Sequence, residues 1–89
     1  MYAAASGVLI EPLADAWCAF SPLSGQTHLI NDTSVAILEH LQAAGHATVA
    51  DLCALLAEET GQPATEAVAM VAGALNTFVL AGLARCLPA

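Results

Sequence analysis

The chain has 89 residues, of which 58% are apolar and only 10% are charged. A soluble domain typically carries about a quarter charged residues, so the composition predicts one domain, spanning 1–89, with some apolar surface left uncovered. Arg85 is the sole lysine or arginine against eight acidic residues, and the formal net charge is −7. Nucleic acid and anionic membranes are therefore not expected as partners, because both are bound largely through lysine and arginine. No signal peptide or membrane-spanning run is recognisable, so a cytoplasmic protein is expected.

The cysteines and histidines give no sign of catalysis or metal binding. Cys18, Cys53 and Cys86 are widely spaced and form no CxxC pair, which predicts buried thiols rather than disulfides or a zinc site. No serine or cysteine stands at a spacing that suggests a nucleophile oriented by a histidine. His28 is expected to be an exposed residue of a strand. The sequence thus predicts a protein that is not an enzyme and that uses no metal and no cofactor.

Three short strands are predicted in the first third of the chain. Val8–Ile10 is an apolar run stopped by Glu11 and Pro12, which is typical of an edge strand because proline cannot donate to a ladder. Trp17–Phe20 forms the second strand and Thr27–Ile30 the third. The segment between these two contains proline and glycine, which favour a reversal. The sequence therefore predicts a small antiparallel meander that ends in a hairpin.

Capping residues and glycines mark three helices after the strands. Asn31 and Asp32 can each cap the first helix, while Thr48 and Asp51 resemble the capping box of the second. The expected helices lie between Asn31 and Gly45, between Thr48 and Gly61, and between Pro63 and Gly82. The expected inward stripes are Val35, Ile37, Leu38 and Leu41; Val49, Leu52, Cys53 and Leu56; and Val68, Val71, Leu75, Phe78 and Val79. Residues 83–87 are expected to form a short tail.

The third strand and the third helix are the most promising binding site. A strand at the edge of a sheet leaves unpaired N–H and C=O groups, which an extended peptide could complete as a further strand. The neighbouring helix is rich in alanine, which leaves shallow space for apolar side chains of a guest. The candidate peptide-binding residues are Thr27, His28, Leu29 and Ile30 on the strand and Met70, Ala74 and Thr77 on the helix.

The chain resembles PqqD-type proteins, and among them the PqqD-like peptide chaperones of the HPr-rel-A system. The resemblance lies in Trp17, in SPLSGQTHLIN over 21–31, in TSVAILEHL over 33–41 and in AGL over 81–83, and it covers about residues 8 to 85. It implies an α+β, winged-helix-like fold with a small three-stranded antiparallel sheet followed by three helices. It also implies a recognition element for ribosomally made, modified peptides, in which the leader peptide adds to the third strand beside the third helix. The implied partners are a precursor peptide and the enzyme that modifies it.

Two other functions remain open at the level of sequence. The order of the helices would also suit a winged-helix regulator that binds DNA, although the charge of the chain opposes this. Alternatively, the protein could be a structural adaptor that homodimerises through its apolar surface or its free strand edge.

Overall fold

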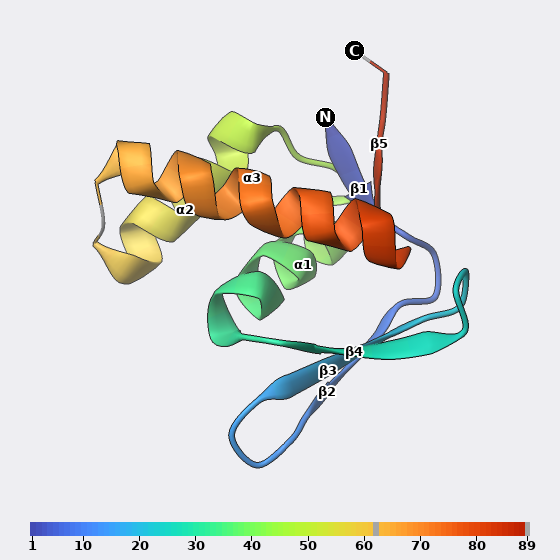
Figure 1. Ribbon diagram of the computed structural model, residues 1–89. Helices are drawn as coiled ribbons and strands as arrows, with labels where there is room; N and C mark the ends of the chain where they lie inside the picture. Colours follow the sequence, from blue (N-terminus) through green and yellow to red (C-terminus); the bar gives the residue numbers. More distant parts are fainter. Residues whose placement is uncertain (62, 89) are drawn as a thin grey trace.

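A three-stranded antiparallel sheet and three helices form the body of the protein (Figure 1). The structure is a computed structural model, and it describes residues 1–61 and 63–88. In chain order the elements are β1 (Tyr2–Ala4), β2 (Leu9–Pro12), β3 (Trp17–Ser21), β4 (Gln26–Ile30), α1 (Asp32–Ala44), α2 (Val49–Thr60), α3 (Ala64–Ala81) and β5 (Ala84–Cys86). The predicted α+β architecture, a three-stranded sheet followed by three helices, is confirmed.

The sheet has the strand order β2-β3-β4, so β2 and β4 are its two edges. Leu9 pairs with Phe20 at one end of β2 and Pro12 pairs with Trp17 at the other. The prediction that Glu11 and Pro12 stop the first strand is therefore wrong, because both belong to β2. An edge strand accommodates a proline, since one side of the strand has no ladder to which the missing N–H would contribute.

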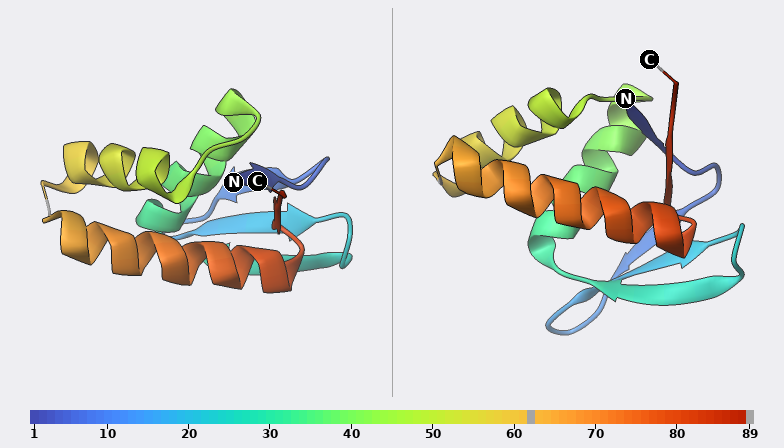
Figure 2. Two further views of the ribbon diagram at one scale, coloured as in Figure 1. Left: turned by 90° about the horizontal axis from the view of Figure 1, so that it is seen from above. Right: turned by 45° about the horizontal axis from the view of Figure 1, so that its top comes forward.

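A second, two-stranded sheet joins the two ends of the chain. Strand β1 runs antiparallel to β5, with Ala3 opposite Arg85, and Figure 2 shows these first and last strands side by side. Tyr2 also exchanges backbone hydrogen bonds of 2.8 and 2.9 Å with Ala47, in the connection between α1 and α2. The predicted tail after the third helix is thus wrong for Ala84–Cys86, which is a strand, and its partner β1 was not predicted.

The predicted helix boundaries are confirmed by their caps. The Asn31 side chain accepts a hydrogen bond of 2.8 Å from the Ser34 N–H and so caps α1. Thr48 and Asp51 form the reciprocal capping box of α2, and Gly82 ends α3 in the left-handed conformation. Within the residues that the structure describes, no helix has the length and apolar character needed to cross a membrane.

The core lies between the sheet and the helices, and α3 contributes Ala67, Val71, Leu75 and Phe78 to it. Val68 and Val79 were predicted to face inward, but they are 49% and 39% exposed. The buried stripe recurs every three or four residues and leaves these two valines on its flanks, because Ala67 takes the inward position next to Val68. The smaller side chain lets α3 approach its neighbours closely.

The cysteines are less buried than predicted. Cys18 and Cys53 are half-buried and Cys86 is exposed on β5. The prediction of three buried thiols is wrong for Cys86, which is the last residue of β5 and lies beyond Ala84, the buried residue on the same face of the strand.

Candidate functional site

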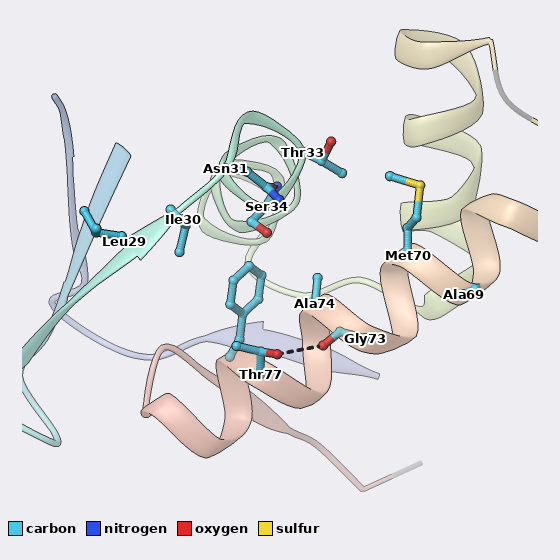
Figure 3. A pocket seen from close by; sticks show the side chains of 11 residues that line it. Leu29, Ile30, Asn31, Thr33, Ser34, Ala69, Met70, Gly73, Ala74 and Thr77 are labelled. Carbon is cyan, nitrogen blue, oxygen red and sulfur yellow. Dashed lines mark hydrogen bonds between the residues drawn. The ribbon is translucent and has the colours of Figure 1, made fainter. Parts of the chain in front are cut away.

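An open groove of about 520 Å³ lies between β4, α3 and the start of α1 (Figure 3). It is lined by Leu29, Ile30, Asn31, Thr33, Ser34, Ala69, Met70, Gly73, Ala74, Thr77 and Phe78. Five of the seven residues predicted from the sequence belong to this lining, two from the strand and three from the helix. Thr27 and His28 lie on β4 outside the lining.

Strand β4 forms one wall and presents a free edge. Its five residues pair with β3, from Trp17 opposite Ile30 to Ser21 opposite Gln26, and among the described residues no strand pairs with its other side. Alternate residues of an edge strand direct their N–H and C=O groups away from the sheet. The Leu29 side chain is 74% exposed beside this edge. The wall therefore offers unpaired backbone groups next to an uncovered apolar side chain.

Helix α3 forms the opposite wall with small and flexible side chains. Ala69, Gly73 and Ala74 leave the space of the groove open, and the thioether of Met70 stands at one end (Figure 3). The Thr77 hydroxyl donates a hydrogen bond of 3.0 Å to the Gly73 carbonyl oxygen of its own helix. Because methionine adapts its shape to a neighbour at low cost, this wall suits apolar side chains of varied shape.

The start of α1 closes one end of the groove with polar side chains. Asn31, Thr33 and Ser34 line this end, whereas the prediction for Asn31 was a capping role alone. That role is real, since the Asn31 side chain accepts from the Ser34 N–H. The position of Asn31 in the sequence could have predicted its place in the groove. A helix cap that directly follows an edge strand lies at the end of a groove beside that strand.

His28 differs from its prediction as an exposed residue. It is half-buried, and it shares a face of the sheet with Ala19, its fully buried partner on β3. Its Nε2 atom is buried and has no hydrogen-bond partner among the described residues. The His28 side chain therefore faces the interior of the molecule and does not line the groove.

Two hydrogen bonds hold the walls in place. Buried Ser21, at the end of β3, donates from Oγ to the Gly82 carbonyl oxygen at 2.7 Å and so ties the sheet to the end of α3. At the other end of β3 the Trp17 Nε1–H donates to Asp32 Oδ1 at 2.9 Å and ties the sheet to the start of α1. Both helices that line the groove are thus fixed to the strand next to β4.

The groove is suited to binding rather than to charge-based chemistry. None of the described residues in its lining has an ionisable side chain. No group of three or more histidine, cysteine or acidic residues that could hold a metal occurs in 1–61 and 63–88. The arrangement can hydrogen-bond an extended backbone along β4 and accept apolar side chains against α3.

The family model described as coenzyme PQQ synthesis protein D (PqqD) matches residues 17–84. The chain belongs to the PqqD family. The matched region of this PqqD-family protein begins with β3 and ends at Ala84, so it contains the whole lining of the groove. The prediction of a PqqD-like protein is confirmed.

Two solved structures share the fold of this PqqD-family protein over nearly its full length. TbiB1, solved in complex with the TbiA(β) leader peptide, superposes with a TM-score of 0.79 and 9% identity, covering 98% of this chain and 99% of that one. A lasso peptide synthetase B1, complexed with the leader peptide, gives a TM-score of 0.74 and 21% identity, with 98% of each chain covered. At these identities the likeness establishes the fold. None of the curated proteins matches the chain at a significant level.

Proposed function

We propose that this protein is a non-catalytic, cytoplasmic peptide chaperone that binds the leader of a ribosomally made precursor and presents it to a modifying enzyme. The leader adds as a fourth strand to β4, and its apolar side chains enter the groove against α3. The peptide-binding residues are Thr27, His28, Leu29 and Ile30 of β4 and Met70, Ala74 and Thr77 of α3.

One observation carries the proposal: the free edge of β4 runs alongside an apolar groove. A backbone ladder supplies affinity without regard to sequence, and pockets for alternate side chains supply the selectivity. The two solved proteins that share this fold were each captured with a leader peptide, which supports a leader as the guest here.

Filling the groove tests this function. Ala74 lines the groove, so Ala74→Leu places a larger side chain in the space that the leader would occupy. We expect this variant to bind synthetic leader segments of the precursor about tenfold more weakly or worse, since overpacking costs about 1–3 kcal/mol. Isothermal titration calorimetry measures the change.

Ala72→Leu is the matched control, because Ala72 lies on the same helix, is exposed and does not line the groove. It should bind the same segments with the affinity of the unmodified protein. Equal binding by Ala74→Leu and Ala72→Leu would show that the leader does not occupy this groove.

A further inference from the structure

A second groove, of about 550 Å³, lies on the other side of the first turn of α1. It is lined by Trp17, Asp32, Val35, Ala36, Glu39, His40, Leu55 and Glu59, from β3, α1 and α2. Thr33 and Ser34 line the first groove, whereas Asp32 and Val35 line this one. The two grooves therefore share α1 as a common ridge and have different chemistry.

Three carboxylates line the second groove. Asp32 and Glu39 stand seven residues apart on α1, which places them on the same face two turns apart. Glu59 comes from α2, one turn after Leu55. The single arginine of the sequence, Arg85, lies on β5 opposite Ala3, so the chain supplies no lysine or arginine to this lining. The described lining thus carries three carboxylates and, apart from His40, no basic side chain, which favours a cation from outside.

The apolar part of the lining adds a recognition surface for a particular cation. Trp17 is half-buried in this groove, and its indole N–H is already engaged by Asp32. A guanidinium stacks on an aromatic ring and pairs with carboxylates through two parallel N–H donors, whereas an ammonium is a strongly hydrated point charge. The aliphatic side chains of Val35 and Leu55 suit the methylene stem of such a residue.

We propose that this second groove binds an arginine side chain of a protein partner. If the proposed function holds, that partner is the enzyme that modifies the peptide. An arginine seated in the groove would place this enzyme on the opposite side of α1 from the bound leader, within one helix width of it.

Two short peptides test the proposal on the full chain. Acetyl-Leu-Arg-Leu-amide is titrated against the ¹⁵N-labelled protein, and its citrulline counterpart, which keeps the shape but lacks the charge, serves as the control ligand. Trp17 is the only tryptophan, so its indole N–H signal reports on this groove without ambiguity. We expect the arginine peptide to shift that signal and to bind about tenfold more tightly than the citrulline peptide, as one cation–π contact and one or two partly exposed ion pairs would give together.

Matched charge variants separate a specific site from general attraction. Glu39→Gln with Glu59→Gln removes two carboxylates of the lining, and Glu58→Gln with Glu66→Gln removes two exposed carboxylates outside it. The first pair should weaken arginine binding about tenfold, and the second should leave it within about twofold. Equal loss in both pairs, equal binding of citrulline, or no shift of the indole signal would overturn the proposal.

The same sample separates this inference from the proposed function. A leader segment that leaves the β4 amides unchanged counts against the proposed function, and the response of the Trp17 indole to arginine does not depend on that result. In the converse result, the leader shifts the β4 amide signals while the arginine peptide leaves the Trp17 indole signal unchanged. This result would overturn only the proposal that the second groove binds arginine.

Discussion

Asp51 shows how one residue at a helix end contributes to the stability of the protein. The Thr48 N–H donates to Asp51 Oδ2 at 3.1 Å, and the Asp51 N–H donates to Thr48 Oγ1 at 3.1 Å. The hydrogen bonds from the Thr48 backbone and from its side chain hold the pKa of Asp51 below its ordinary value of 3.8. The folded state therefore favours the ionised carboxylate more than the unfolded chain does.

Asp51→Asn should make the stability of the protein less sensitive to acid. The pKa of Asp51 is lower in the folded state than in the unfolded chain. Its contribution to the stability of the protein is therefore complete above the ordinary pKa, and it is lost as pH falls through the pKa of the folded state. The difference in Tm between the unmodified protein and the variant should therefore shrink between about pH 6 and about pH 3. Circular dichroism measures both melting curves, and a difference that stays constant over this range would contradict the account.

At the scale of elements, the contact between β3 and the end of α3 sets the geometry of the first groove. Gly82 has φ +76°, and a Cβ atom there would lie 2.8 Å from Ser21 Oγ, the atom that donates to the Gly82 carbonyl oxygen. Glycine is thus required at this position both by the backbone conformation and by the close approach of Ser21. A side chain at Gly82 would push α3 away from the sheet.

Gly82→Ala should destabilise the fold more than the matched variant Gly61→Ala. Gly61 ends α2 in the same left-handed conformation, with φ +69°, and apart from those of Gly61 and its chain neighbours none of the described atoms lies within 4 Å of where its Cβ would be. Gly61→Ala should cost about 1 kcal/mol of unfolding free energy, and Gly82→Ala about 2 kcal/mol more, because it also breaks the hydrogen bond from the buried Ser21 side chain. Urea denaturation measures both free energies, and equal losses would mean that Ser21 does not restrain α3.

Local signals in the sequence predicted the helices and the central strands, and they failed where long-range pairing decides the structure. Asn31 and the Thr48–Asp51 box mark helix starts through contacts within three residues, so they can be read directly from the chain. In contrast, β1 has three residues and pairs with β5 at the far end of the sequence. A segment of that length carries no periodic signal of its own.

The candidate site was predictable only where local patterns in the sequence decide the structure. The edge position of Thr27–Ile30 follows from strand order, and the position of Met70, Ala74 and Thr77 follows from helical periodicity. Hydropathy could not show which of Ala67 and Val68 faces the core, because close packing of α3 favours the smaller side chain at the buried position. The second groove was not predicted, because no local pattern in the sequence relates its residues on β3, α1 and α2 to one another.

At the scale of the whole molecule, charge and apolar surface are divided between different regions. The first groove is lined by residues without charge, while the second groove carries three of the eight carboxylates of the chain. All three helices lie on one side of the three-stranded sheet (Figures 1 and 2), which leaves Leu9 and Leu29 exposed. The expectation of uncovered apolar surface is thus confirmed, and the net charge of −7 disfavours a leader rich in acidic residues.

Strand addition at β4 is the central claim, and amide hydrogen exchange tests it most directly. With a saturating leader segment, the amides of β4 that point away from β3 should exchange at least about tenfold more slowly, because each would donate to the backbone of the leader. The amides that already pair with β3 serve as an internal reference and should change far less. A leader that binds while the outward amides of Gln26–Ile30 exchange as fast as in the free protein would contradict the account.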